Sequence, residues 1–436
     1  MGRGTLDPNA LAALRSERVD WRFKGMPAHF TGATIDEITR QRPDLFDDAF
    51  TGPLLVLSRP ALQHNLRVMA EWCERHGLAL APHGKTHMSP QLLAAQFEAG
   101  AWAVTVATVH QARVYRAFGV NRVVLANQLV DPAGLRWLAG ELDRDPEFEF
   151  VCWVDSVRGV ELMTAALAGS APARPVDVAV ELGGPGGRTG VRTDAEALAV
   201  AQAVAASPVL RLVGVAGWEG AFGHDTTPET LATVDTYLRR LRALVLSLAG
   251  AGYFDGLDRV LVTAAGSAYF DQVGAVFREP WPDGLPVLPV LRSGSYLTHD
   301  DGLYRRLSPF SRRHALPGGE PLRPALQAWA QVSSRPEPEL ALLTLGRRDV
   351  PFDQDLPEPQ LVRRNGGEAE PLTGCRVTAL NDQHAFLALS PEARVEVGDW
   401  IGLGVSHPCT AFDKWQLIPV VDADGRTVVD LIRTFF

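Results

Sequence analysis

The chain has 436 residues, 46% of them hydrophobic and 21% charged, so it can bury a large core without disulfide or metal staples. This composition excludes a disordered chain, a collagen-like repeat and a small disulfide-rich protein. The net charge of −9 argues against nucleic acid or an anionic membrane surface as a partner. No apolar run approaches the roughly 20 residues that cross a bilayer, and the N-terminus lacks the apolar core of a signal peptide.

Cysteine usage predicts a reducing compartment. The four cysteines lie far apart in the chain and form no CxxC pair: Cys73, Cys152, Cys375 and Cys409. We therefore expect free thiols and a cytoplasmic protein.

The first 305 residues predict a parallel sheet with helical crossovers. Residues 1–50 are polar and predict short helices and loops, 54–57 a strand, and the apolar spacing over 62–73 an amphipathic helix. Helical stretches at 91–99, 109–118 and 194–206 then separate short, nearly continuous apolar runs, which indicate a sheet covered on both faces. Eight β/α units in about 220 residues suit a TIM barrel, with an open doubly wound sheet as the alternative. The eight predicted strands are 78–81, 103–106, 122–126, 149–154, 176–181, 210–216, 259–264 and 287–291.

A β domain is predicted after the barrel. The stretch 305–324 is rich in Arg, Pro and Gly and predicts a connection, and Asp424-Gly425 predicts a hairpin turn. We therefore expect an N-terminal segment at 1–50, a barrel at 51–305 and a β domain at 306–436, with the strand at 54–57 as a candidate member of the β domain. The predicted strands of this domain are 340–345, 375–380, 385–389, 400–405, 417–421 and 427–432.

Several of the segments that follow barrel strands carry polar or glycine-rich motifs. Active sites of TIM barrels lie in these loops, at the C-terminal ends of the strands. Glycine and serine after the last two strands predict a phosphate site, because the backbone N–H groups of such turns bind anions; ordinary surface turns are the alternative. The segments are PHGKTH at 82–87, ELGGPGGRTG at 181–190, WEG at 218–220, AGS at 265–267 and RSGSY at 292–296.

Lys85 is the strongest candidate for chemistry. It closes the apolar first strand between two histidines, where its amine loses hydration and is suited to a Schiff base. A phosphate site across the barrel mouth would complete a site for pyridoxal phosphate. The alternative is a solvated lysine in an ordinary loop.

The β domain contributes a possible metal site. His407 and Cys409 are one residue apart, so an imidazole and a thiolate can face one ion, and sulfur favours zinc. His-x-Cys also occurs by chance. His384 is a candidate acid–base group, with a structural role as its alternative.

Together these motifs resemble the fold-type III pyridoxal-phosphate enzymes of the D-serine dehydratase and D-threonine aldolase group, in particular its bacterial cryptic D-serine deaminase-like branch. The resemblance runs from about residue 50 to the C-terminus, in the family's order. It implies an alanine-racemase-like (β/α)8 barrel with a C-terminal β domain, a homodimer, pyridoxal phosphate on Lys85, and a divalent metal, zinc or manganese, on His407 and Cys409.

The resemblance also implies individual roles. Lys85 would hold the cofactor and accept a proton, with His83 beside it; Arg188 would contact the cofactor's phenolic oxygen, and Tyr296 would lie beside the phosphate. Gly266, Ser267, Gly294 and Ser295 would hold that phosphate. Better-known members have a tyrosine where this chain has Trp218, which would either face the pyridine nitrogen or pack against the cofactor. The glycine run at 183–187 is a second departure from the family's pattern.

The resulting hypothesis is a lyase that eliminates the β-hydroxyl of a 3-hydroxy D-amino acid, giving a 2-oxo acid and ammonia. The metal would act as a Lewis acid on the hydroxyl. The alternative is retro-aldol cleavage to glycine and an aldehyde; dehydration is preferred because the resemblance associates His-x-Cys with dehydratases and His-x-Asp with aldolases. A non-catalytic cofactor carrier lacks the β domain, and a racemase needs a second acid–base residue, usually a tyrosine of the β domain, whereas this chain has no tyrosine after Tyr304.

Overall fold

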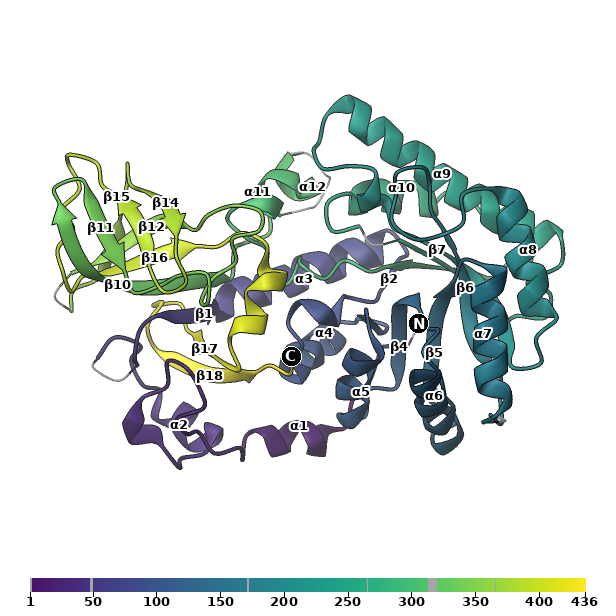
Figure 1. The fold of residues 1–436 in the computed structure, drawn as a ribbon, viewed down its shortest axis with the longest axis horizontal. Coiled ribbons are helices and arrows are strands. Elements are labelled where there is room, and N and C mark those ends of the chain that lie inside the picture. The colour runs from purple at the N-terminus through teal and green to yellow at the C-terminus, as the bar shows by residue number, and fades with distance from the viewer. Residues whose placement is uncertain (1, 48–49, 171, 265, 313–319, 365) are drawn as a thin grey trace.

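The fold consists of a barrel and a β-rich domain joined side by side. The computed structural model describes residues 2–47, 50–170, 172–264, 266–312, 320–364 and 366–436. In Figure 1 the barrel lies on the right and the antiparallel sheet on the left, with α3 (Arg59–Arg75) running between them. Residues 313–319 of the predicted connection and Ala265 of the predicted phosphate segment lie outside the described residues.

The predicted parallel sheet is confirmed. Its eight strands follow the order β2-β9-β8-β7-β6-β5-β4-β3, and neighbours are parallel throughout. Each strand falls within two residues of the range predicted from its apolar run. The strands are β2 (Ala79–Leu80), β3 (Val104–Val106), β4 (Arg122–Gln128), β5 (Glu149–Val154), β6 (Val176–Leu182), β7 (Leu210–Gly217), β8 (Val260–Ala264) and β9 (Val287–Leu291).

Backbone hydrogen bonds bring the two ends of this sheet together. The N–H of Trp102 donates to the carbonyl of Leu80 at 2.6 Å, and the N–H of Thr105 donates to that of Pro82 at 2.8 Å. His83 and Thr105 form a further parallel bridge. These contacts join the segment of β2 to that of β3, so the sheet closes into the expected alanine-racemase-like barrel rather than an open doubly wound sheet.

Side chains fill the barrel because successive strand residues point to opposite faces. Ala79 and Ala81 point into the interior, where they meet Trp102 and Trp153. Leu80 lies between them in sequence and packs instead into the outer core with the helices. Small alanines thus pack beside two tryptophans in the interior of the barrel.

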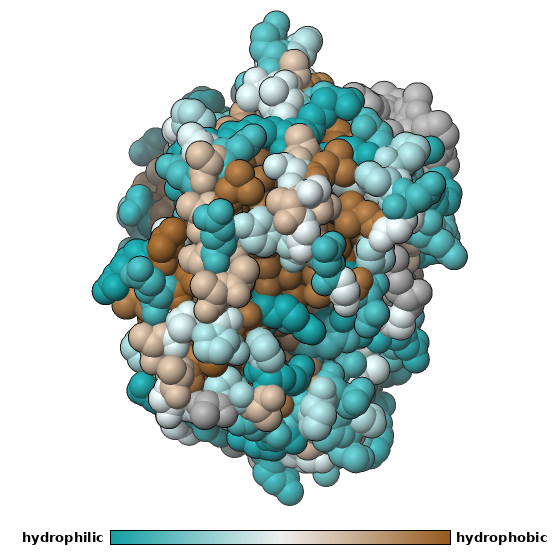
Figure 2. Space-filling view, turned by 90° about the vertical axis from the view of Figure 1, so that its right-hand side faces the viewer, coloured by the Kyte–Doolittle hydropathy of each residue, from teal (hydrophilic) through white to brown (hydrophobic). Residues whose placement is uncertain are grey.

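The outer helices begin with polar caps and bury one side. In α7 the buried residues Val160, Met163 and Leu167 are spaced by three and four, the stripe expected of a half-buried helix. Figure 2 shows the outer face near α7 and α8, where hydrophobic side chains show in the middle and hydrophilic ones surround them. The barrel helices after α3 are α4 (Pro90–Glu98), α5 (Val109–Ala117), α6 (Pro132–Arg144), α7 (Val157–Ala168), α8 (Asp194–Ala205), α9 (Pro228–Gly250) and α10 (Phe270–Phe277), followed by the short α11 (Leu303–Leu307) and α12 (Pro309–Arg312).

The C-terminal sheet includes a strand from the start of the chain. β1 (Leu54–Ser58) pairs antiparallel with β10 (Leu326–Glu337) and parallel with β17 (Leu417–Val421). β10, β12 (Glu358–Arg363) and β13 (Ala369–Pro371) had no predicted counterpart, because polar residues and prolines interrupt their apolar pattern. The remaining strands are β11 (Leu340–Leu343), β14 (Arg376–Leu380), β15 (Ala385–Ala388), β16 (Trp400–Gly404) and β18 (Val428–Arg433).

The N-terminal segment packs on this second sheet. The helix α2 (Ile35–Gln41) contributes Ile38 to a small core that also holds Val56, Trp329 and Leu431, and α1 (Pro8–Leu14) lies before it in the chain. A capping box of Thr34 and Glu37 fixes the start of α2. Among the described residues, none of the helices is both long and apolar enough to cross a membrane.

We expect Ile38→Ala to lower the free energy of unfolding by about 2–5 kcal/mol, because Ile38 is fully buried and its loss leaves a cavity. Urea denaturation measures this change. Val397→Ala is the matched control, since Val397 is 60% exposed and its truncation should leave the transition unchanged. Equal midpoints for the two variants would contradict the assigned packing.

Candidate functional site

A cavity of about 570 Å³ opens at the C-terminal ends of the barrel strands, where the H-x-C turn of the β domain closes one side. Twelve residues were predicted for the site, and nine line this cavity. These nine are His83, Lys85, Arg188, Trp218, Ser267, Gly294, Ser295, His407 and Cys409.

Lys85 projects from a tight turn that directly follows β2. The turn is the 3-10 helix Gly84–Thr86, and the carbonyl of Gly84 accepts a hydrogen bond from the Tyr115 hydroxyl at 2.9 Å. A Cβ at Gly84 would lie only 2.5 Å from that hydroxyl oxygen, so the close approach requires glycine. The chain has only three lysines, and Lys85 is the one that lines the cavity.

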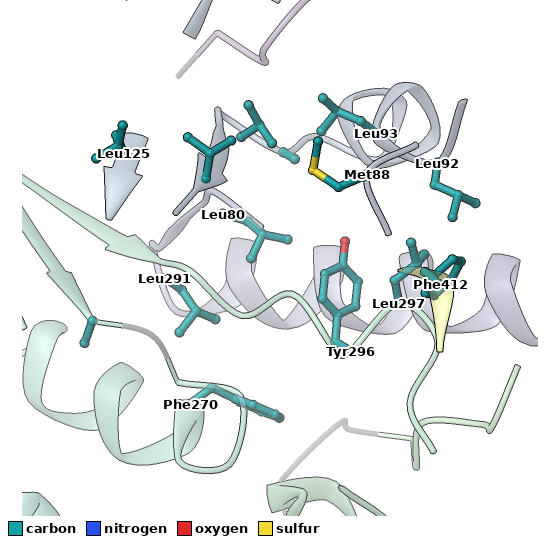
Figure 3. Close-up of a cluster of buried hydrophobic side chains, with 14 of the residues drawn as sticks. Leu80, Met88, Leu92, Leu93, Leu125, Phe270, Leu291, Tyr296, Leu297 and Phe412 are labelled. Carbon is teal, nitrogen blue, oxygen red and sulfur yellow. The ribbon is translucent and has the colours of Figure 1, made fainter. Parts of the chain in front are cut away.

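The structure places Tyr296 away from the predicted phosphate site. Its ring lies in the outer core near Met88 and Leu92, as Figure 3 shows. Its hydroxyl accepts a hydrogen bond from Gln96 at 3.1 Å, and Gln96 in turn contacts His87. Tyr296 is 3% exposed and does not line the cavity, so the structure offers no support for its predicted place beside the phosphate; the side chain instead supports the turn after Lys85.

Tyr304, on α11, lines the cavity, as does Tyr269. It does so together with Ser267 and Ser295, the two predicted phosphate-binding serines. Burial, followed by the nearby Cys409, raises the pKa of Tyr304, so the phenol stays protonated and can donate. Gly266 is not a lining residue; its N–H donates to the Glu219 carboxylate at 2.5 Å.

An arginine holds the glycine-rich loop in place. Arg192 donates to four carbonyls of this loop, at distances of 2.7–3.2 Å, those of Gly187, Arg188, Thr189 and Gly190. The Arg188 guanidinium lies 4.2 Å from the ring centre of Trp218, a stacked cation–π contact. A Cβ at Gly220 would lie 2.7 Å from the indole nitrogen of Trp218, so glycine makes room for this ring. Nothing in the sequence pattern marks Arg192 beyond its place after the loop.

The floor of the cavity is electropositive. Burial lowers the pKa of Arg292 to about 10, although Glu219 and Glu181 oppose the shift, so its guanidinium stays charged at neutral pH. Arg292 donates to Thr263 at 2.9 Å and to the carbonyl of Gly217. Burial, and then the charges of Lys85, Arg292 and Arg188, lower the pKa of His83 far below its usual range. His83 is therefore a neutral imidazole beside several cations.

His407 and Cys409 face the barrel from the other side. The Cys409 sulfur lies 3.3 Å from the Thr86 hydroxyl, one residue from Lys85. Burial raises the pKa of Cys409, but hydrogen bonds from His407 and Thr86 and the charge of Lys85 outweigh it, and the net shift is downward. Hydrogen bonding to Cys409, and then to Asp353, raises the pKa of His407 to about 9.

Asp300 fixes the position of this turn and was not predicted. Its buried carboxylate accepts the backbone N–H of His407 at 3.0 Å and that of Tyr304 at 2.8 Å. It also accepts the N–H of Gly302 at 3.0 Å. One side chain therefore joins the H-x-C turn to the helix that carries Tyr304.

His384 lies elsewhere. It occupies the exposed turn between β14 and β15, where its carbonyl accepts the N–H of Asn381 at 2.8 Å, and it does not line the cavity. The structure therefore offers no support for the predicted acid–base role of His384.

The cavity fits pyridoxal phosphate. Lys85 offers an amine, Arg188 a cation, and Ser267, Ser295 and Tyr304 a group of hydroxyls. The buried Nδ1 of His83 has no hydrogen-bond partner among the described residues, so the cavity wall offers one polar atom that a bound ligand could satisfy. A Cβ at Gly294 would lie 2.7 Å from the Cβ of His83. The loop after β9 can therefore approach the loop after β2 this closely only with glycine at position 294.

The donor set of the H-x-C turn fits a borderline-soft divalent metal, because it pairs an imidazole with a low-pKa thiol. Within the described ranges, no cluster of three or more His, Cys, Asp or Glu side chains is arranged to hold a metal. The protein thus offers two ligands here and leaves other positions open.

Comparison with known proteins agrees with this geometry. Residues 57–270 match the family "Alanine racemase, N-terminal domain", and residues 325–421 match the "Putative serine dehydratase domain". The chain is 29% identical to a D-threonine aldolase of Arthrobacter sp over 372 residues, 85% of this chain and 88% of that protein. It is also 29% identical over 180 residues to a D-threo-3-hydroxyaspartate dehydratase of Delftia sp. (strain HT23), 41% of this chain and 46% of that protein.

The fold agrees as well. The structure of a D-threonine aldolase from Filomicrobium marinum superposes with a TM-score of 0.73 at 24% sequence identity, covering 89% of this chain and 96% of that one. The first match ends at residue 270, before the last barrel strand β9, and the second begins at residue 325, directly before β10 of the second sheet. The family resemblance is confirmed: the chain joins an alanine racemase N-terminal domain to a putative serine dehydratase domain, and its relatives include a D-threonine aldolase and a D-threo-3-hydroxyaspartate dehydratase, the kind of fold-type III pyridoxal-phosphate lyase that the sequence resembles.

Proposed function

We propose that the protein is a pyridoxal-phosphate- and divalent-metal-dependent lyase that removes the β-hydroxyl of a 3-hydroxy D-amino acid, giving a 2-oxo acid and ammonia. One observation carries this proposal: Lys85 of the barrel and the His407/Cys409 pair of the β domain line the same cavity. A substrate held at Lys85 therefore lies within reach of an ion at the H-x-C turn.

Lys85 has two tasks in this reaction. When bound, pyridoxal phosphate supplies a carbonyl carbon for the amine and an electron-withdrawing ring that acidifies the Cα–H bond of an attached amino acid. The Lys85 amine, released when the substrate amine takes its place, accepts the Cα proton. Arg188 and Trp218 lie side by side on the cavity wall and orient the ring, while Ser267, Ser295 and Tyr304 offer hydroxyl donors to the phosphate.

His407 and Cys409 position the leaving group. A divalent ion supplies a Lewis acid that helps the hydroxyl depart. The imidazole and the thiolate would hold the ion on the β-domain side of the cavity that Lys85 also lines. Because the chain would supply only these two ligands, other positions of the ion would be open to the substrate.

Retro-aldol cleavage to glycine and an aldehyde is the second candidate. It uses the same residues, and the aldolase of Arthrobacter sp matches 85% of this chain. Dehydration is preferred because the second ligand is Cys409: the resemblance associates His-x-Cys with dehydratases and His-x-Asp with aldolases. The deciding experiment incubates the enzyme with D-serine, D-threonine and 3-hydroxy-D-aspartate and scores ammonia plus 2-oxo acid against glycine plus aldehyde.

We also infer a cytoplasmic homodimer bound to zinc, with manganese as the alternative metal. All four cysteines are free thiols, in keeping with a reducing compartment. The dimer follows from the family resemblance and stays a prediction that sedimentation velocity can check. Elemental analysis of the purified protein identifies the metal.

We expect Lys85→Ala to abolish turnover, because attachment of the cofactor and removal of the proton both depend on this amine. Borohydride reduction of the holoenzyme followed by peptide mapping should place the cofactor adduct on Lys85 alone. Lys414→Ala is the control, since Lys414 does not line the cavity and its variant should keep the adduct. An adduct on Lys24 or Lys414 would refute the assigned site.

Chelation should stop ammonia release and leave the visible absorption of the bound cofactor intact, because His407 and Cys409 lie on the β-domain side of the cavity. Added zinc or manganese should restore activity. Cys409→Ser should behave like the chelated enzyme, since a neutral hydroxyl is a far poorer zinc ligand than a thiolate. Full deamination by a demonstrably metal-free enzyme would show that the Lewis-acid role is wrong.

A further inference from the structure

A carboxylate lies directly behind the candidate metal ligand His407. One carboxylate oxygen of Asp353 accepts a hydrogen bond from His407 Nδ1 at 2.5 Å. Its other oxygen accepts a hydrogen bond from the Thr410 hydroxyl at 2.8 Å. Both oxygens of Asp353 are thus engaged by the turn that carries His407 and Cys409. Asp353 itself lies in the loop after β11, more than fifty residues earlier in the chain.

This contact decides which ring nitrogen of His407 is available. A histidine binds a metal as the neutral imidazole, which carries its proton on one nitrogen and its lone pair on the other. With Asp353 accepting at Nδ1, the proton belongs there and the lone pair lies on Nε2. Cys409 lies two residues further along the same turn and lines the same cavity as His407. The lone pair and the sulfur are then available to one ion.

The backbone makes such support necessary. His407 has φ +57° and ψ 76°, a left-handed conformation that is unfavourable for a non-glycine residue. A residue in this conformation stays in place only when its surroundings hold it. Asp300 holds its backbone N–H, and Asp353 holds its ring.

We propose that Asp353 is a positioning residue for metal binding: it fixes the tautomer and the ring orientation of His407, so that Nε2 and the Cys409 sulfur face one divalent ion. This inference rests on the proposed metal site at His407 and Cys409 and goes beyond it. Carboxylates behind ligating histidines orient the ring and raise its basicity as a ligand.

The same loop supplies a matched control. Asp355 lies two residues further on, and its side chain is as exposed as that of Asp353, 37% against 40%. The Asp355 carboxylate accepts the Ser406 hydroxyl at 3.0 Å and pairs with Arg306 at 2.7 Å. Asp355→Asn therefore removes a carboxylate from this loop without touching the His407 ring.

The test measures zinc affinity of the holoenzyme by competition with a chromogenic chelator, so its readout does not depend on turnover. Asp353→Ala should weaken the apparent Kd for zinc by about 10–100-fold. The apparent Kd of Asp353→Asn for zinc should lie between those of Asp353→Ala and the parent protein, because an amide oxygen can still accept a hydrogen bond from Nδ1. Asp355→Asn should keep the parent affinity, and the thermal midpoints of all three variants should agree.

Two outcomes would overturn the inference, and they are distinguishable. If His407→Ala loses zinc while both Asp353 variants bind it as tightly as the parent, Asp353 has no positioning role and the proposed metal site stands. If His407→Ala and Cys409→Ser also bind zinc at the parent affinity, the metal site itself is misplaced and the inference falls with it. A cobalt(II)-substituted sample gives a second readout, since a changed ligand arrangement shifts the visible spectrum of the ion.

Discussion

The contact between the Thr86 hydroxyl and the Cys409 sulfur, at 3.3 Å, joins the two halves of the candidate site. Thr86 belongs to the tight turn that follows the first barrel strand, and Cys409 to a turn of the second sheet. Neither turn is a site alone, since one offers an amine and the other a pair of metal ligands. The proposed chemistry therefore depends on the barrel and the β domain keeping this relative position.

Two features of the chain hold the two domains in this relative position. β1 lies before the barrel in sequence yet pairs with β10 and β17, so the barrel is inserted between strands of one sheet. The path of α3 between the two bodies is visible in Figure 1. Closer to the site, the buried carboxylate of Asp300 connects the H-x-C turn to α11 through backbone hydrogen bonds. Burial raises the pKa of Asp300 even with these hydrogen bonds, so the carboxylate depends on its N–H partners to remain charged.

Sequence periodicity was enough for the barrel, because strands buried on both faces give short apolar runs that stand out against the helices. It was less informative for the second sheet, where β10 mixes buried positions with polar ones and ends in Pro336 and Glu337. Motifs found Lys85, Arg188, His407 and Cys409, because the spacing of glycine, histidine and cysteine around them is distinctive. They did not find Tyr304, Asp300 or Asp353, because these residues act through contacts between segments far apart in the chain. Arg192 was missed because its contacts depend on how the glycine-rich loop folds. For Tyr296, proximity to Gly294 and Ser295 in sequence does not reveal which side of the turn the ring takes.

The central claim is that the barrel lysine and the β-domain metal ligands serve one substrate. Diffraction recorded at the zinc absorption edge, from crystals of the borohydride-reduced holoenzyme, tests this claim most directly. The account predicts an anomalous peak bonded to His407 and Cys409, in the same cavity as a cofactor covalently attached to Lys85. A zinc peak at other residues, or a reduced cofactor on Lys24 or Lys414, would contradict it.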